Sequence, residues 1–279
     1  MAERIVIEGD QAMLSGEDGA QHAAPLEAWT RRVNQASLRG LTREPIADLV
    51  RWHVTCGIAD VVIVELPPAL RVLQWIAADS PQPYGPEATV CPRRLATPYV
   101  ILKASFRRHR LLHRAEVFYR NAPLENCSGP GGELFWPNLL NVSPNAHGCT
   151  AWLCTQFLDA EIRPGGITAD LNAVVHHLWG GPFNLSSEAH ENASTFSKAR
   201  DEAVDPRVID VERWEAESVA DPRFILGVPW RSTGLDVRKL VLAELACQQI
   251  ATFPNTASAL ANLLLRCKTP TKGREQDED

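Results

Sequence analysis

Short apolar runs dominate the first half of the chain and predict β-strands. Four runs have the length and the β-branched content of strands: Asp60–Leu66 (DVVIVEL), Leu70–Ala77 (LRVLQWIA), Tyr99–Phe106 (YVILKASF) and Ala115–Arg120 (AEVFYR). The pair Pro67-Pro68 separates the first two, because proline cannot donate to a sheet ladder. Arg4–Glu8 (RIVIE) indicates a further short strand, and the prolines of residues 79–93 indicate a long loop.

Apolar residues at helical spacing predict helices on both sides of these strands. The first helix is expected from Thr42, with Pro45 in its first turn, to Gly57. The others follow the strands: one begins near Thr168 and stops at Gly180-Gly181-Pro182, one covers Leu235–Phe253, and one runs from Asn255 or Thr256 through Leu265. A short helix is also indicated around Ser197–Ala203.

Strands grouped together and followed by grouped helices are typical of an α+β fold. We expect an N-terminal extension with a helix over residues 1–59 and a main domain with the C-terminal helices over residues 60–267. Residues 268–279 (KTPTKGREQDED) predict a charged, flexible tail. There is no internal repeat, no Gly-x-Gly-x-x-Gly after a strand and no phosphate loop, so nucleotide binding has no support.

Composition and charge exclude several classes of function. The chain has 28 Lys and Arg against 34 Asp and Glu, a net charge of −6, so a global basic field for nucleic acid is absent. No apolar run reaches about 18 residues, so no membrane span is predicted. The first residues, MAERIVIEGDQ, lack the basic-then-apolar pattern of a secretory signal, and we expect a cytoplasmic protein. The seven cysteines are then reduced thiols rather than a disulfide framework.

The turn-rich segment Leu134–Cys154 (LFWPNLLNVSPNAHGCTAWLC) concentrates the candidate chemistry. Three asparagines and a histidine precede Cys149: Asn138, Asn141, Asn145 and His147. A nucleophilic thiol needs partial exposure, a backbone that presents it, and donors for the oxyanion that forms when a carbonyl is attacked. The alternative is that Cys149 is an ordinary loop thiol and that the asparagines only satisfy turns.

This segment resembles the active-site segment of ubiquitin-conjugating enzymes. More specifically, it is similar to the bacterial ubiquitin-conjugating-like proteins found beside activating-enzyme and deubiquitinase homologues. In that family the catalytic Cys lies eight positions after an Asn, and Asn141 and Cys149 have this spacing in NVSPNAHGC. The helix after the Cys and its end, HHLWGGPFN, are also similar. The resemblance covers roughly residues 60–185.

Two departures from the family pattern keep alternatives open. Leu139-Leu140 precedes Asn141, whereas Trp136-Pro137-Asn138 is closer to the family's His-Pro-Asn triplet but lies three residues earlier. Asn138 is therefore a second candidate for the oxyanion donor. Gly148 directly precedes Cys149, whereas the common form has two residues between them, and this leaves Cys154 as a second candidate nucleophile.

The resemblance implies a ubiquitin-conjugating-like (UBC-like) fold, with an antiparallel four-stranded sheet, flanking helices and N- and C-terminal additions. It implies that an activating enzyme hands the C-terminus of a ubiquitin-like protein to Cys149 as a thioester. An amine of a target protein would then attack, while Asn141 or Asn138 donates to the oxyanion. No metal, nucleotide or other cofactor is needed on this chain. Relatives of this kind are associated with antiviral defence in bacteria.

Two other classes of function stay open. One is a catalytically inactive UBC-like module that only binds a ubiquitin-like protein. The other is a Cys-His thiol hydrolase, in which one of three histidines acts as base and an acid orients it. The candidates are His176, His177 and His190 for the base, and Asp170 and Glu191 for the acid.

A zinc site and a basic docking patch are the remaining candidates. His147, Cys149 and Cys154 can be three zinc ligands, but four residues between the cysteines lie at the limit of the usual spacing, and no second cysteine pair completes a site. The run Lys103–Arg114 has five Lys or Arg and no acid. It is either a solvated hairpin tip or a docking patch for an acidic partner such as an activating enzyme.

Overall fold

The computed structural model describes residues 4–8, 11–15, 21–25, 49–56, 58–76, 80, 88–124, 132–155, 158 and 166–252. Over these residues the chain combines antiparallel sheets with helices, as the α+β prediction states. The first strands, β1 (Arg4–Glu8), β2 (Gln11–Ser15) and β3 (Gln21–Pro25), form a three-stranded antiparallel sheet. Strand β1 covers the short strand indicated by RIVIE. The helix predicted through Leu265 and the tail at 268–279 lie outside the described residues.

The large sheet has nine strands, so the prediction of a four-stranded sheet is wrong. Its main path has the spatial order β12–β13–β10–β8–β5–β4. The bounds along this path are β4 Val50–Cys56, β5 Ala59–Leu66, β8 Tyr99–Arg107, β10 Glu116–Arg120, β12 Val142–Pro144 and β13 Ala151–Leu153. Off the path, β9 (Arg110–Leu111) pairs with β8, and β11 (Glu133–Phe135) pairs with β10 and with β14 (Ser232–Asp236). Strands of two or three residues are too short for an alternating pattern to mark them in the sequence.

Strand β4 lies where the sequence predicts the end of the first helix, and that part of the helix prediction is wrong. Trp52 and Val54 are half-buried, whereas Arg51, His53 and Thr55 are exposed. This alternation is that of a strand with one face on the core. Helical and strand periods are hard to distinguish over so short a window, and pairing with β5 decides for the strand. This pairing crosses the boundary expected between residues 59 and 60.

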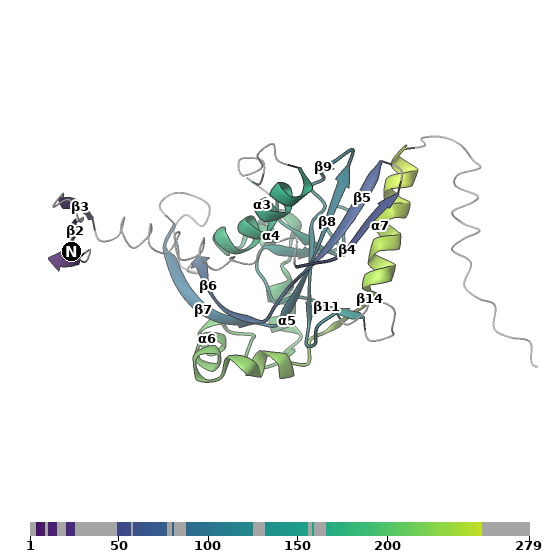
Figure 1. The fold of residues 1–279 in the computed structure, drawn as a ribbon. Helices are drawn as coiled ribbons and strands as arrows, with labels where there is room; N and C mark the ends of the chain where they lie inside the picture. Colours follow the sequence, from purple (N-terminus) through teal and green to yellow (C-terminus); the bar gives the residue numbers. More distant parts are fainter. Residues whose placement is uncertain are drawn as a thin grey trace, which may run out of the picture.

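Two long strands bend at prolines. After Pro67-Pro68 the chain continues from β5 into β6 (Ala69–Ile76), and across Pro98 it continues from β7 (Val90–Thr97) into β8. Strands β6 and β7 form a two-stranded sheet of their own, which curves away from the large sheet (Figure 1). Strand β6 confirms the prediction for Leu70–Ala77. Strand β7 occupies part of the predicted loop at 79–93, because proline is tolerated on an edge strand.

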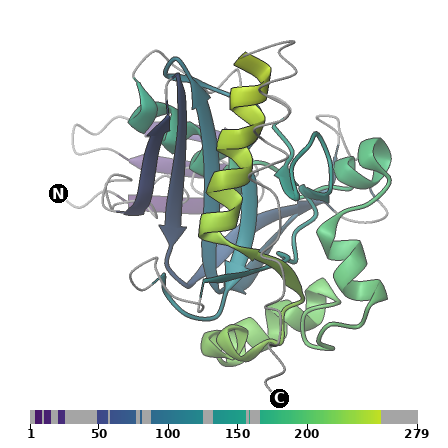
Figure 2. The ribbon, with the colours of Figure 1, turned by 90° about the vertical axis from the view of Figure 1, so that its right-hand side faces the viewer.

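The helices follow most of the strands along the chain. Their bounds are α3 Ile167–Gly180, α4 Ser186–Glu191, α5 Thr195–Asp201, α6 Val211–Ala220, the 3₁₀-helix η2 Pro222–Gly227 and α7 Val237–Thr252. Helices α3 and α7 confirm the predictions near Thr168 and over Leu235–Phe253. Helix α7 covers one face of the large sheet, and α3 lies on the opposite side (Figures 1 and 2). Strand β5 is therefore buried at every residue, which explains its continuous apolar run.

An aromatic cluster packs the segment after α3 against strand β6. Phe183 stacks on Trp75 with 5.9 Å between ring centroids, and Phe196 meets Trp75 edge-on at 5.2 Å. The backbone N–H of Phe183 donates to the carbonyl of Gln74 at 2.6 Å. These contacts hold residues 180–184 beside β6. None of the described helices is long and apolar enough to cross a membrane.

Candidate active site

The hairpin of β12 and β13 carries both candidate nucleophiles. Its register pairs Ser143 with Trp152, and the backbone N–H of Cys154 donates to the carbonyl of Asn141 at 2.9 Å. Asn141 and Cys154 are therefore cross-strand neighbours. Cys149 lies in the loop that joins the two strands, more than about 10 Å from Asn141 at the strand rise of ~3.3 Å per residue. The hairpin thus brings the predicted oxyanion donor to Cys154 rather than to Cys149.

Cys149 is buried, with 5% of its surface exposed. Burial raises the pKa of the Cys149 thiol to about 12, and Glu116 adds to the rise, while Lys103 and Arg114 oppose it. Its sulfur lies 3.9 Å from the carbonyl oxygen of His147, to which the thiol can donate. Because the thiolate is the nucleophilic form, Cys149 in this environment is a poor nucleophile at neutral pH.

A buried ion-pair network lies beside Cys149. Lys103 on β8 is fully buried, and its Nζ lies 2.5 Å from a carboxylate oxygen of Glu116 on β10. The same Nζ lies 2.8 Å from Glu244 on α7, which is also buried. These opposite charges satisfy one another without water, as buried charges require. The network ties α7 to the sheet next to the hairpin.

The same network fixes the loop of the hairpin. Arg114 pairs with Glu244 at 3.1 Å and donates to the carbonyls of His147 at 3.1 Å and Gly148 at 3.0 Å. A carboxylate oxygen of Glu116 accepts from the backbone N–H of Thr150 at 2.6 Å. The loop backbone has positive φ at His147 (51°) and Gly148 (71°), a region that non-glycine residues seldom adopt. Charge-assisted hydrogen bonds therefore hold the loop in a conformation that it would rarely adopt alone.

Cys154 lies in a more accessible and more polar environment. Its side chain is half-buried, and Ser186, at the start of α4, has its Oγ 4.0 Å from the sulfur. The Ser186 hydroxyl can donate a hydrogen bond to this sulfur. His177 on α3 donates through Nε2 to the carbonyl of Cys154 at 2.8 Å. Two helices thus hold this cysteine at the end of β13.

The two candidate asparagines have different roles. Asn141 donates through Nδ2 to the carbonyl of Pro182 at 3.0 Å and accepts from the N–H of Asn184 at 3.2 Å. Since an amide nitrogen carries two N–H donors, one remains for an oxyanion. Asn138 is fully buried and donates through Nδ2 to the carbonyl of Val208. Its contact is inside the core, so the geometry favours Asn141 as the donor.

A carboxylate–imidazole pair lies on the hairpin face that Cys154 shares. Alternate residues of a strand point to the same face, so Ser143 and Trp152 share the face of Asn141 and Cys154. Ser143 Oγ donates to Glu191 at 3.4 Å, and Glu191, at the end of α4, lies 3.6 Å from Nε2 of His147. The His147 ring also packs on the Trp152 ring, with 4.2 Å between centroids. The sequence proposed Glu191 as a partner of other histidines and did not indicate this pairing.

The other histidines and acids of the hydrolase hypothesis are not gathered in this way. His176 and His190 are exposed, and His177 uses Nε2 on the Cys154 carbonyl. Asp170 and His177 lie on the same helix, two turns or about 10 Å apart. Burial raises the pKa of Asp170, which accepts a backbone hydrogen bond from Leu111. Within the described ranges no three His, Cys, Asp or Glu side chains form a metal-binding group, so His147, Cys149 and Cys154 do not assemble one.

The basic run between Lys103 and Arg114 has two different parts. Lys103 and Arg114 belong to the buried network. Between them β8 and β9 meet at a tight turn in which Arg108 and His109 both have positive φ, 50° and 62°, and are exposed. Two such residues match the two-residue turns that join neighbouring antiparallel strands. The solvated hairpin tip considered from the sequence is therefore present, and only its outer residues are available to a partner.

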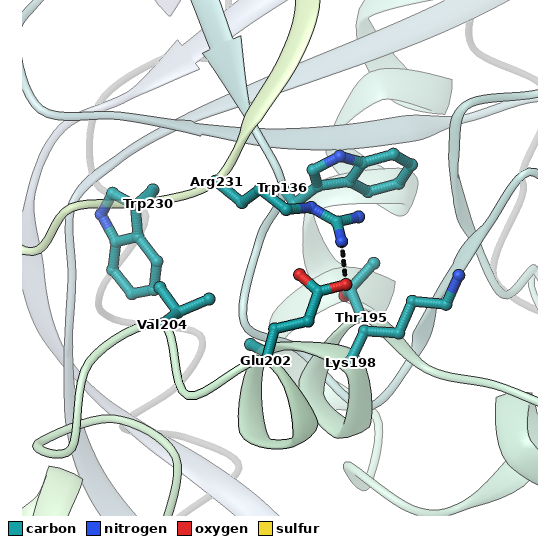
Figure 3. Close-up of a pocket in the computed structure, with 8 residues that line it drawn as sticks. Trp136, Thr195, Lys198, Glu202, Val204, Trp230 and Arg231 are labelled. Atoms are coloured by element: carbon teal, nitrogen blue, oxygen red, sulfur yellow. Dashed lines mark hydrogen bonds and ion pairs between the residues drawn. The ribbon is translucent and has the colours of Figure 1, made fainter.

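A small pocket lies near the Trp136-Pro137-Asn138 triplet (Figure 3). The guanidinium of Arg231 lies 5.2 Å from the ring centroid of Trp136 and pairs with Glu202 of the α5 C-terminus. Lys198 on α5 completes the charged side of the pocket, and Trp230 lies at its other end (Figure 3). The ion pair satisfies the charges of Arg231 and Glu202. No sequence pattern indicated this pocket, because its residues come from three separate segments.

In comparisons with known proteins, no family model, no curated protein and no solved structure matched the chain. The interpretation of the site therefore rests on its geometry and chemistry.

Proposed function

We propose that this protein carries an acyl group as a thioester on Cys154 and transfers it to an amine of a target protein. The single observation that carries the proposal is the cross-strand pairing of Asn141 with Cys154, with Ser186 Oγ 4.0 Å from the sulfur. This arrangement unites a partly buried thiol, a hydroxyl that can donate to its sulfur, and a neutral amide donor beside it. Those are the requirements for thiol acyl transfer.

The chemistry proceeds in two steps on this chain's own residues. The Cys154 thiolate attacks the carbonyl carbon of an incoming thioester, and the oxyanion that forms accepts from the second N–H of Asn141. Loss of the incoming thiolate leaves the acyl group on Cys154. In the second step an amine attacks the same carbonyl carbon and the Cys154 thiolate leaves. A thiolate suits both steps because it is a strong nucleophile and a good leaving group.

The choice of Cys154 differs from the spacing argument, which favours Cys149. Cys149 is buried and its thiol pKa is raised to about 12, so little of its thiolate exists near neutral pH. Cys154 is less buried than Cys149. In this proposal the loop that contains Cys149 is a structural element, held by Glu116 and Arg114.

The resemblance to UBC-like proteins supplies the rest of the proposal. Three of the four predicted strands, β5, β8 and β10, are paired in chain order, and the Asn–Cys hairpin and α3 follow them, which supports a UBC-like arrangement inside the larger sheet. The fourth, β6, pairs with β7 in a separate sheet. The donor would be a ubiquitin-like protein activated by a partner enzyme in a reducing cytoplasm, within an antiviral system. These partners come from the resemblance alone.

The test uses a synthetic peptide thioester that ends in glycine, and therefore needs no activating enzyme. The purified chain is incubated with the peptide and analysed by intact mass and by gel, with and without reductant. We expect a reductant-sensitive adduct that is lost in Cys154→Ala and kept in Cys149→Ala. Cys154→Ser should instead give an adduct that resists reductant, because an oxyester replaces the thioester.

Other outcomes of this experiment favour other functions. An adduct lost only in Cys149→Ala would return the nucleophile to Cys149. Release of free peptide acid with no adduct would favour the thiol hydrolase. A chain that forms no adduct but binds a ubiquitin-like protein would be the inactive binding module.

A further inference from the structure

The hairpin face of Cys154 holds a second reactive group that the proposed transfer does not use. His147, Glu191 and Trp152 lie together there: Nε2 of His147 is 3.6 Å from a carboxylate oxygen of Glu191, and the His147 and Trp152 ring centroids are 4.2 Å apart. His147 is exposed over 57% of its side chain, whereas Glu191 is exposed over 15%. A mostly exposed imidazole is therefore held by a mostly buried carboxylate.

The hairpin and α4 both connect this pair to the Cys154 site. Ser143 and Trp152 lie two residues along the strands from Asn141 and Cys154, which is about 7 Å. Helix α4 gives the same separation, because Ser186 lies at the sulfur, Glu191 lies at Ser143, and five residues of helix rise about 7.5 Å. The His147–Glu191 pair is therefore a neighbour of the Cys154 site along both the hairpin and α4.

We infer that His147, held by Glu191, accepts the proton from a primary amine that attacks the acyl group on Cys154. This inference rests on the proposed thioester and names the acceptor class, a lysine-type amine. Two contacts stabilise the charged imidazolium that results. The Glu191 carboxylate pairs with it, and the Trp152 ring beneath it attracts a cation.

The proton balance of the step is complete within these residues. With Nε2 turned to Glu191, the other ring nitrogen, Nδ1, is free to act as the base. The neutral amine attacks the carbonyl carbon and forms the C–N bond, and its nitrogen then gives a proton to Nδ1. The C–S bond breaks, and the Cys154 thiolate takes the proton back from the imidazolium or from water. An amide and a free thiol are the products.

Arg114 gives this arrangement its rigidity. It donates to the carbonyl of His147 at 3.1 Å, at a residue with a φ of 51°. The ion-pair network of Lys103, Glu116 and Glu244 thus determines where the imidazole stands relative to the hairpin face. Glu191 and Arg114 are positioning residues in this inference, and His147 is the group that touches the amine.

The test compares two nucleophiles on the loaded protein. The chain is loaded with the glycine peptide thioester, freed of excess reagent, and discharged with free lysine or with hydroxylamine. The nitrogen of hydroxylamine is far less basic than that of lysine, so its adduct gives up a proton to water without help. We expect His147→Gln to slow discharge to lysine by about 100-fold, mainly in kcat, and to leave discharge to hydroxylamine unchanged. Glu191→Gln should slow lysine discharge less, because it acts through His147.

His53→Gln is the matched control, because His53 lies on β4 at the opposite edge of the sheet. It should discharge to both nucleophiles like the wild type. Equal slowing of lysine and hydroxylamine in His147→Gln would mean that the residue only holds the hairpin, and unchanged lysine discharge would also overturn the inference. A wild-type chain that does not load at all overturns the proposed function instead, and the inference with it.

Discussion

Glu244 gives the most quantitative prediction about this fold, because it is buried between two cations. It lies 2.8 Å from Lys103 and 3.1 Å from Arg114. Burial alone would raise the pKa of Glu244, but the two cations outweigh burial and lower it from 4.5 to about 2. At ~1.4 kcal/mol per tenfold change, this difference corresponds to about 3 kcal/mol of stability at neutral pH. Breaking a buried ion pair by removing one partner costs about 3–5 kcal/mol, which agrees.

The perturbation is Glu244→Gln, which keeps the shape of the side chain and removes its charge. We expect the free energy of unfolding at pH 7 to fall by about 3 kcal/mol, measured by urea denaturation. For a domain of about 200 residues this lowers Tm by roughly 6–12 °C. The control is Glu212→Gln: Glu212 pairs with Arg93 at the surface and is 63% exposed, so its loss should cost less than about 1 kcal/mol.

The pH dependence separates this explanation from a simple packing defect. The folded pKa of Glu244 is lowered, so its contribution is complete above about 4.5 and is lost as the pH falls toward about 2. The difference between wild type and Glu244→Gln should therefore shrink as the pH falls from 7 to 3. A loss below about 1 kcal/mol at pH 7, or a difference that does not change with pH, would refute the electrostatic reasoning.

Two further predictions follow from burial. Iodoacetamide at pH 8 should alkylate Cys149 far more slowly than the exposed Cys247, as measured by peptide mass spectrometry. The rate at Cys149 should rise only as the pH approaches about 12, where its thiolate forms. Similar rates at pH 8 would contradict the assignment of Cys149 as a buried structural thiol. Phe183→Ala should lower the free energy of unfolding by about 3–5 kcal/mol, because it removes a fully buried ring stacked on Trp75. A loss below about 1 kcal/mol, measured by urea denaturation, would show that the aromatic cluster around Trp75 can repack.

The sequence predicted the elements whose burial is uniform or strongly periodic. Strands β5 and β8 are long and buried along most of their length, since α7 and α3 cover the two sides of the sheet, and their apolar runs identify them. Helix α3 has its apolar residues on one face and a Gly-Gly-Pro stop. The sequence missed β7, β12 and β13, because their pairing partners, and not their own residues, make them strands.

The candidate site was likewise predicted only in part. The sequence shows the asparagines, the histidine and the cysteines of the segment Leu134–Cys154. It does not show which residue lies across from Asn141, because that depends on the length of the loop between the two strands. A tight loop would place Cys149 opposite Asn141, as the spacing of eight suggests. Here the loop is longer and places Cys154 there instead, and Arg114 and Glu116 bind carbonyl and N–H groups of this longer loop.

Those two charged residues are far from the loop in the sequence and are themselves held by Lys103 and Glu244. The conformation of the hairpin loop is therefore stabilised by a buried ion-pair network that no local motif contains. In the proposal, burial keeps Cys149 protonated inside the loop although Lys103 and Arg114 favour its thiolate, and the hydrogen bond from Arg114 holds the backbone of His147. The proposed division into a structural thiol, Cys149, and a reactive thiol, Cys154, thus rests on the different burial of the two side chains.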